Sequence, residues 1–129
     1  MSPDASTLEY IHRSKTAALI RASIVAGGIA GGATNEDVER LKRFGENIGW
    51  AFQVVDDILD VEESSAVLGK TAGKDQAQQK ATYPALYGIL QSRDMAADLA
   101  AKALSELDCY GERAARLCEL AQFLVARRS

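Results

Sequence analysis

The stretch best suited to chemistry carries three aspartates and reads FQVVDDILD over residues 52–60. On a helix, which turns about 100° per residue, Asp56 and Asp60 lie roughly 40° apart. Gln53 and Asp57 fall in the same broad sector, and the residues around these four are almost all apolar. A helix that is apolar on nearly every side is buried, so we expect its polar sector to face an internal wet cavity.

Three carboxylates in one cavity repel one another, and desolvation adds a cost for each unpaired ion. A cation is therefore expected among them. Magnesium fits, because it is a hard cation that takes one or two carboxylates, keeps several waters and completes its shell with phosphate oxygens. The alternative is a solvated helix face, which is the commoner fate of an isolated DxxxD pair.

Glycines and lysines follow the aspartates in a segment that reads LGKTAGKD over residues 68–75, with Lys80 behind it. Glycines let a loop come close to a ligand, and lysines supply point charges suited to phosphate. Beside the carboxylates they favour a magnesium–diphosphate site, although alone they would be typical of an ordinary solvated loop. The segment is not a Walker loop, because GxxxxGK[ST] does not occur.

A second group of polar residues lies near the start of the sequence. Lys15 and Thr16 interrupt an otherwise apolar run, which would place a cation and a hydroxyl at the same cavity, and His12 lies one turn earlier. Single residues of these types more often belong to the surface, so the spacing alone gives them less weight than the aspartates.

The elements that must position these groups are predicted to be helices. Ser6 and Glu9 form a capping box for a first helix that stops near Gly31-Gly32. Thr34 is a plausible N-cap for a second helix, with Asp37 at its third position, and apolar steps of three and four carry that helix to Val61.

The rest of the chain follows the same helical pattern. Residues 62–81 lack periodicity and are predicted to be a loop with one short helical turn at most. Tyr83-Pro84 opens a third helical segment, Ser92 caps a fourth, and a break at 108–111 leads to a last helix. No run alternates at period two, so the fold class is all-α.

Composition agrees with one globular unit. The chain has 129 residues, of which 47% are apolar and 26% charged, and only two are proline. Its net charge of −3 does not suggest nucleic-acid binding, and Ala22–Ala33 is too short to span a membrane. Charge is uneven, with nine acidic and three basic residues in 34–63. The middle of the chain is therefore where a site is expected.

Compartment is only loosely constrained. The first residues lack the basic-then-apolar order of a secretory signal. Cys109 and Cys118 match neither CxxC nor a disulfide framework, so we expect reduced, partly buried thiols. These features and the acidic pI suit an intracellular protein, in the cytoplasm or the plastid stroma equally.

The joint pattern of FQVVDDILD, KTAGKD over 70–75 and KATYP over 80–84 resembles the second aspartate-rich region of the trans-type polyprenyl diphosphate synthases. The geranylgeranyl diphosphate synthases of plastids and bacteria are the most similar. Lys15 and Thr16 match that family's upstream Lys-Thr pair. The resemblance covers essentially the whole chain, and the joint motif is specific where each part alone is not.

This resemblance implies an isoprenoid-synthase helical bundle and a magnesium-dependent condensation of isopentenyl diphosphate with an allylic diphosphate. Asp56 and Asp60 would bind magnesium, and Asp57 would support the site. With Lys70, these three aspartates form the implied catalytic set. The residues that would hold the allylic diphosphate are Lys15, Thr16, Gln53, Lys70 and Lys80, and Lys74 lies near the same phosphate face of the loop.

The sequence departs from the family in what it lacks. Family members are normally more than twice as long and carry a first motif, DDxxxxD or DDxxD, whereas this chain has one Asp-Asp pair. Residues 1–129 are therefore expected to be a single all-α unit, the C-terminal portion of a synthase domain. A half-bundle would expose an apolar patch well beyond a few hundred Å², which predicts a poorly stable monomer and a homo- or hetero-oligomer with a synthase subunit.

Two alternatives stay open. The chain could be a truncated noncatalytic partner or regulatory subunit of a full-length synthase, although Cys118 has no cysteine at 114 or 122 to form the CxxxC motif of plant small subunits. It could also be a class I terpene cyclase, but these usually carry an Asn-Ser-Glu type motif that does not follow Asp60.

Overall fold

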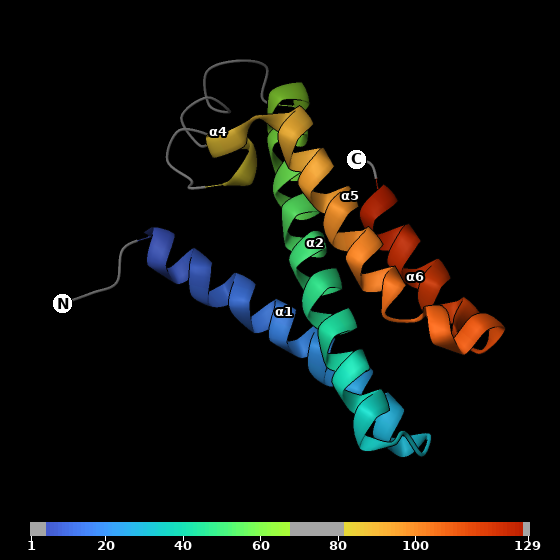
Figure 1. The fold of residues 1–129 in the computed structure, drawn as a ribbon. Helices are drawn as coiled ribbons and strands as arrows, with labels where there is room; N and C mark the ends of the chain where they lie inside the picture. The colour runs from blue at the N-terminus through green and yellow to red at the C-terminus, as the bar shows by residue number, and fades with distance from the viewer. Residues whose placement is uncertain (1–4, 68–81, 128–129) are drawn as a thin grey trace.

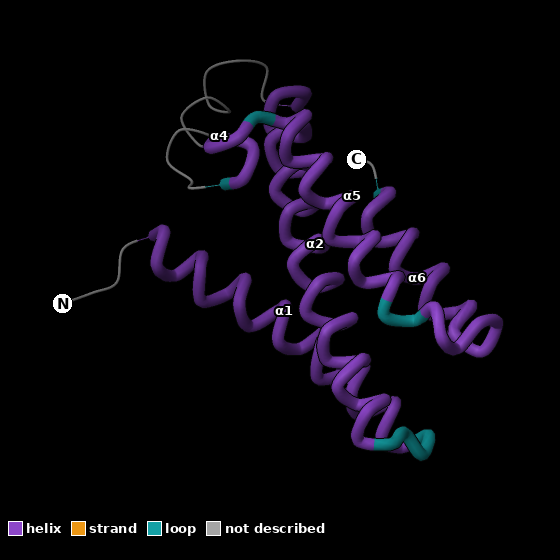
Figure 2. Tube along the Cα trace, viewed as in Figure 1, coloured by secondary structure: helices purple, strands orange, loops and turns teal. Residues whose placement is uncertain are grey.

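The computed structural model describes residues 5–67 and 82–127, with side chains over 14–63 and 82–127 (Figure 1). Its elements are α1 (Ala5–Ala30), α2 (Asn35–Val67), α4 (Tyr83–Tyr87), α5 (Ile89–Ser105), the 3-10 helix η1 (Asp108–Ala114) and α6 (Ala115–Ala126). The described part of the chain contains no strand (Figure 2), which confirms the all-α prediction.

Helix α2 is the centre of the arrangement. It packs against α1, α4, α5 and α6 (Figure 1). Its start is the predicted one: the Asp37 carboxylate accepts the Thr34 N–H at 3.0 Å, and the Thr34 hydroxyl accepts the Asp37 N–H at 3.1 Å. This reciprocal cap satisfies donors that a helix start leaves unpaired.

The predicted end of α2 is wrong, because the helix continues from Val61 to Val67. A loop was predicted after Val61 partly because of the pair Ser64-Ser65. Serine is only mildly unfavourable in a helix, and the neighbouring glutamates and alanine are good helix formers. Glu62 is also fixed by an ion pair with Arg93 of α5.

Small residues set the close approach of α1 to α2. A Cβ placed on Gly45 would lie 2.9 Å from the Arg21 Cα, and a Cβ on Gly49 would lie 3.3 Å from the Ala17 Cα. Both neighbours belong to the backbone of α1, so they cannot give way as a flexible side chain could. From this contact α1 diverges from α2 toward its N-terminus (Figure 1).

The core forms two clusters along α2. The first contains Leu41, Phe44, Ile48, Ala103, Leu107, Ala114 and Ala121, and the second contains Val54, Val55, Ile58 and Ala96. Alanines on α5 and α6 let these helices lie close to the larger side chains of α2. The second cluster is the apolar support directly around the aspartates.

Helices α4 and α5 meet at a sharp turn. Thr82 caps α4 by accepting the Ala85 N–H at 3.2 Å, and Pro84 lies in the first turn, as predicted. The prediction that Ser92 caps the next helix is wrong. Gly88, at φ 83°, joins the two helices, and the Ser92 N–H already donates to its carbonyl at 3.0 Å. Ser92 is fully buried one turn inside α5.

The predicted break near Asp108 is a 3-10 turn with Gly111 at φ 57°. The last helix follows as α6, and Arg127 just beyond it lies over the Phe52 ring at 4.4 Å.

Both cysteines are free, but only Cys118 is partly buried. Cys109 is exposed, contrary to expectation, because it lies on the turn rather than on an inward helix face. Over the described residues, no helix is long and apolar enough to cross a membrane.

Candidate functional site

The polar side chains of the aspartate turn do not share one environment. Gln53 is 8% exposed and Asp57 only 2%, whereas Asp56 is partly buried and Asp60 is exposed. Asp56 and Asp60 are four residues apart and share a face of α2, as expected from the period of the helix. Asp57 lies about 60° further round than Asp60. An enclosed cavity lined equally by all four side chains is therefore not what the structure presents.

The buried carboxylate of Asp57 has a specific partner. Its Oδ2 accepts the Tyr83 N–H at 3.2 Å. Tyr83 is the first residue of α4, so its N–H is one of the donors that has no partner within its own helix. The negative charge of Asp57 also suits the positive end of that helix.

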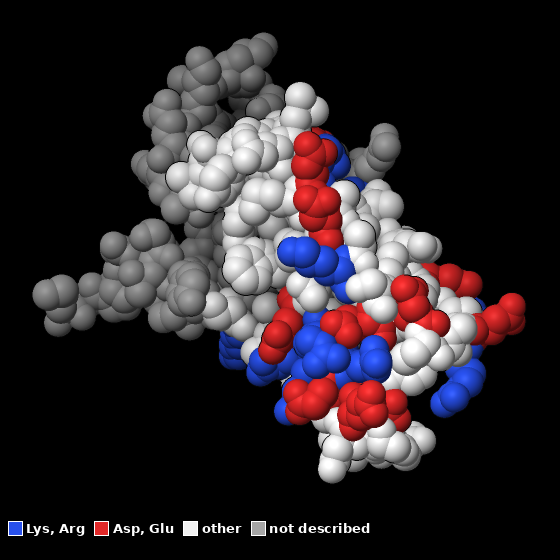
Figure 3. Space-filling model, viewed as in Figure 1, with Lys and Arg blue, Asp and Glu red and all other residues white. Residues whose placement is uncertain are grey.

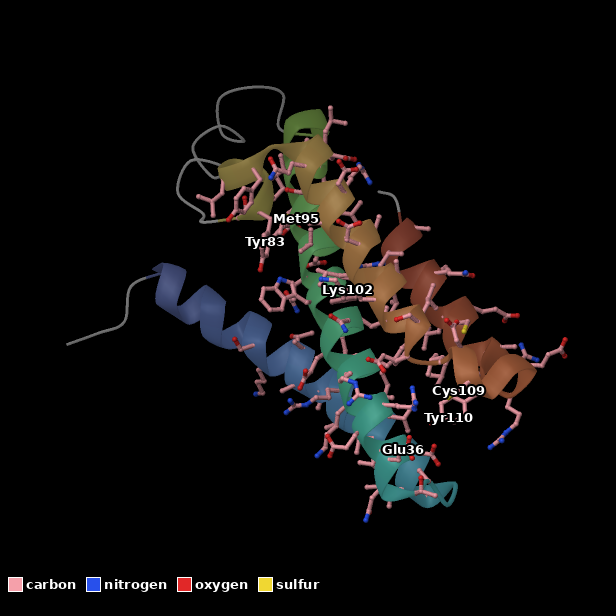
Figure 4. All side chains as sticks on the ribbon, in the orientation of Figure 1. Glu36, Tyr83, Met95, Lys102, Cys109 and Tyr110 are labelled. Atoms are coloured by element: carbon pink, nitrogen blue, oxygen red, sulfur yellow. The ribbon has the colours of Figure 1, made fainter. Side chains whose placement is uncertain are left out.

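Tyr83 makes a second contact with α2. The Trp50 indole N–H donates to the Tyr83 hydroxyl at 2.7 Å. Trp50 precedes Asp57 by seven residues, or about two turns, so both lie on nearly the same face. Figure 4 shows the labelled Tyr83 at the border of α4 and α2. The sequence did not indicate that Trp50 contacts Tyr83, because the two residues are 33 positions apart. The only available signal was the spacing of Trp50 and Asp57, which are seven residues apart.

Helix α1 contacts α2 just before the aspartate turn. Ala17 contacts Gly49, which lies one turn before Gln53, about 6 Å along the helix axis. Thr16 adjoins this contact and is partly buried, whereas Lys15 is exposed. The structure thus places Thr16 beside the aspartate helix at the level just before the site.

The remaining predicted residues lie outside the described part. These are Lys70, Lys74 and Lys80, together with the side chain of His12. Their proposed contacts with diphosphate therefore stay predictions.

A separate polar cluster lies at the other end of α2. Arg43 donates to Glu106 at 2.8 Å, and Arg40 lies 3.9 Å from the same carboxylate. Figure 3 shows mixed acidic and basic side chains over this end, whereas the surface over α4 is uncharged. These paired charges join α2 to the end of α5 and leave no excess of positive charge for an anion.

The same end carries a strong hydrogen bond that the sequence did not reveal. The Tyr110 hydroxyl donates to the Asp37 carboxylate at 2.5 Å (Figure 4 labels Tyr110). This bond raises the pKa of Tyr110 to about 12. Hydrogen bonds from Tyr110 and Thr34 lower the pKa of Asp37. Tyr110 therefore links η1 to the cap of α2.

The described donor set is compatible with magnesium. Asp56 and Asp60 supply two carboxylates on one face, and Asp60 is open to solvent. Magnesium is commonly bound through one or two carboxylates with water and substrate phosphate completing its shell. Among residues 14–63 and 82–127, no group of three or more His, Cys, Asp or Glu could hold a metal by itself. The pair fits a metal that is shared with a phosphate ligand.

Comparison with known proteins agrees with this geometry. The Polyprenyl synthetase family model matches residues 2–119. The chain is 50% identical over 127 residues to a chloroplastic geranylgeranyl pyrophosphate synthase of Capsicum annuum, covering 98% of this chain and 34% of the relative. It is 47% identical over 123 residues to a chloroplastic "heterodimeric geranylgeranyl pyrophosphate synthase large subunit 1" of Arabidopsis thaliana, covering 95% and 33%.

A solved structure supports the fold. It is described as a candidate farnesyl-diphosphate synthase from Marinomonas sp. MED121, with 30% identity and a TM-score of 0.72 over 96% of this chain and 41% of that one. The chain belongs to the polyprenyl synthetase family, and its helices are part of an isoprenoid-synthase fold. It spans about a third of the length of the curated relatives.

Proposed function

We propose that this chain supplies the second aspartate-rich site of a magnesium-dependent prenyltransferase of isoprenoid biosynthesis. Its reaction would condense isopentenyl diphosphate with an allylic diphosphate, as a geranylgeranyl diphosphate synthase does. The observation that carries the proposal is the Asp56–Asp60 carboxylate pair on one face of a helix whose other sides are buried. Helix α1 contacts the same helix about two turns before Asp56, at Gly49.

In this proposal Asp56 and Asp60 hold magnesium through their carboxylates. The bound metal would neutralise charge on the departing diphosphate. The C1–O bond of the allylic substrate breaks with its electron pair on the diphosphate, the double bond of isopentenyl diphosphate attacks C1, and the resulting cation gives up a proton to the released diphosphate. Gln53 and Thr16 supply hydrogen-bonding groups near the diphosphate, and Lys15, Lys70 and Lys80 supply positive charge.

A rigid helix favours this chemistry because the two carboxylates need a fixed separation. Val54, Val55 and Ile58 are all buried against α5 and neighbouring residues. Close packing on these sides leaves α2 little freedom to turn. The carboxylates can then meet a metal–diphosphate complex without reorganisation.

The second candidate is a noncatalytic or regulatory partner of a longer synthase. One observation favours it: a relative is named as the large subunit of a heterodimeric geranylgeranyl pyrophosphate synthase, so that protein is named as one of two subunits. We propose a homo- or hetero-oligomer with a synthase subunit in either case. The plant relatives are named as chloroplastic, and we keep the cytoplasm and the plastid stroma as proposed compartments.

A prenyltransferase assay separates the two candidates. The chain is incubated with magnesium, labelled isopentenyl diphosphate and a dimethylallyl, geranyl or farnesyl diphosphate acceptor. Product formed by the chain alone supports the prenyltransferase, and the carbon-chain length of the product identifies the reaction. No product, with capture of the Capsicum annuum relative at micromolar concentration, supports the partner subunit. Neither product nor capture would contradict both.

A further inference from the structure

We propose that Asp57 is a positioning residue, which fixes the start of α4 against α2 and does not bind the metal that the proposed function assigns to Asp56 and Asp60. This inference rests on the proposed function for the metal, but its structural part does not need it. The family resemblance implies only that Asp57 supports the site, whereas the structure gives its carboxylate a specific partner in α4.

The first argument is burial. Asp57 is 2% exposed, whereas Asp60 is exposed and Asp56 is intermediate. A cation that keeps several waters needs ligands at the edge of a wet space. Asp57 instead lies beside the apolar cluster of Val54 and Ile58, where a carboxylate is tolerated only when it is hydrogen-bonded.

The second argument is the partner. The Asp57 carboxylate accepts the N–H of Tyr83 at 3.2 Å, across 26 residues of sequence. Neighbouring Thr82 is 4% exposed and caps α4 through Ala85. Asp57 and Thr82 together satisfy two donors in the first turn of a helix that has only five residues. Such a short helix is not stable by itself, so these contacts determine where it forms.

The third argument is that α2 contacts the same tyrosine twice. Trp50 donates to the Tyr83 hydroxyl at 2.7 Å, while Asp57 accepts from its backbone. The two contacts come from one face of α2, about two turns apart. They restrain both the position and the direction of Tyr83. We call Trp50, Asp57 and Tyr83 the tyrosine clamp.

The clamp places α4 beside the aspartate turn without using the Asp56–Asp60 face. For the clamp, the negative charge at position 57 is then less important than an acceptor oxygen on a side chain of the same length as aspartate. Asparagine keeps such an oxygen, whereas alanine and leucine do not. A metal-binding aspartate differs in this respect, because loss of its negative charge by itself weakens metal binding.

The test measures amide hydrogen exchange at Tyr83 by NMR in the wild-type chain and in Asp57→Asn, Asp57→Ala and Asp57→Leu. We expect exchange within about threefold of wild type for asparagine, since charged hydrogen bonds are roughly twice as strong as neutral ones. For alanine and leucine we expect exchange at least about tenfold faster. Leucine keeps the buried volume, so it preserves the test if the alanine variant does not fold.

A second measurement on the same proteins addresses the metal. The magnesium dependence of binding of geranyl thiodiphosphate, an ionisation-resistant analogue, is compared in Asp56→Asn and Asp57→Asn. We expect at least about tenfold weaker binding for Asp56→Asn. Asp57→Asn should stay within about threefold of wild type, because it keeps the clamp acceptor.

Two results would overturn the inference. One is unchanged Tyr83 exchange in both Asp57→Ala and Asp57→Leu. The other is a loss of magnesium-dependent binding in Asp57→Asn as large as in Asp56→Asn. If the wild-type chain binds no diphosphate analogue, the proposed function fails, while the exchange data still decide the clamp.

Tyr83→Phe provides an independent check, because it removes only the hydroxyl that accepts from Trp50. The chain has a single tryptophan, so its fluorescence reports on the surroundings of Trp50. We expect a changed emission spectrum and faster exchange in α4, with the helical content of the rest preserved. A spectrum and exchange pattern identical to wild type would contradict the clamp.

Discussion

At the scale of single residues, adjacent polar side chains on α2 differ in what they contact. Asp57 is buried and accepts a backbone N–H, whereas Asp60 is exposed. Asp60 lies four residues after Asp56, so the two negative charges are neighbours on the helix surface. Like charges at this spacing destabilise a helix by about 0.2–0.5 kcal/mol. Residues that serve ligand binding are expected to lower the stability of the protein in this way. The resulting prediction can therefore be tested by a stability measurement without substrate.

We predict that Asp60→Asn raises the free energy of unfolding by about 0.2–0.5 kcal/mol and that the gain shrinks at high salt. Urea denaturation at two ionic strengths measures both effects. A clear loss of stability in Asp60→Asn would mean that its carboxylate holds the fold rather than a ligand.

The Tyr110–Asp37 bond gives a prediction about pH. The pKa of Tyr110 is raised to about 12, so its contribution to stability is complete below pH 10 and is lost as the pH rises toward 12. The pKa of Asp37 is lowered, so its contribution is present above pH 4 and is lost as the pH falls through that lowered value.

We therefore expect wild type to be more stable than Tyr110→Phe at pH 7, and expect the difference to shrink at both extremes. Thermal unfolding of the two proteins between pH 3 and 11 measures it. A difference that does not vary with pH would show that the phenol contributes by packing rather than through the charged hydrogen bond.

At the scale of elements, the contact of α1 with α2 is set by glycine. Gly45→Ala would bring its Cβ to 2.9 Å from the Arg21 Cα, and overpacking of this kind costs about 1–3 kcal/mol. Gly27→Ala is the matched control, since nothing lies within 4 Å of its Cβ and alanine favours a helix by about 1 kcal/mol. Denaturant unfolding should show opposite signs for the two; equal effects would contradict the close packing of the helices.

Local chemistry explains which elements could be predicted. Thr34 with Asp37, and Tyr83 with Pro84, are signals contained in a few neighbouring residues, and both helix starts occur where predicted. The end of α2 depends on contacts across the fold, such as the pair of Glu62 with Arg93, and the prediction for it was wrong. The prediction for Ser92 was wrong because Gly88 begins α5 one turn earlier. The period of the helix placed Asp56 beside Asp60, but it could not show that Tyr83 engages Asp57.

At the scale of the whole molecule, large apolar side chains stay exposed. Those above half exposure are Leu19, Ile29, Trp50, Leu86, Leu90, Leu120 and Phe123. Leu90, in the first turn of α5, is 82% exposed, and Leu86, in α4, is 68% exposed. Exposed large apolar side chains favour association where they lie next to one another.

We predict that the chain self-associates at micromolar concentration and that Leu86→Ser with Leu90→Ser reduces this association. Sedimentation velocity over a range of concentrations measures both. A compact monomer that melts cooperatively at every concentration would contradict the expectation of a half-bundle that needs a partner surface.

The most direct test of the proposed site is calorimetric titration of the chain with geranyl thiodiphosphate, with and without magnesium. The proposal predicts binding that requires magnesium, that is weakened at least about tenfold by Asp56→Asn, and that is unchanged by Asp94→Asn. Binding that is equal in the presence of a chelator, or equal in Asp56→Asn, would contradict a magnesium–diphosphate site on α2.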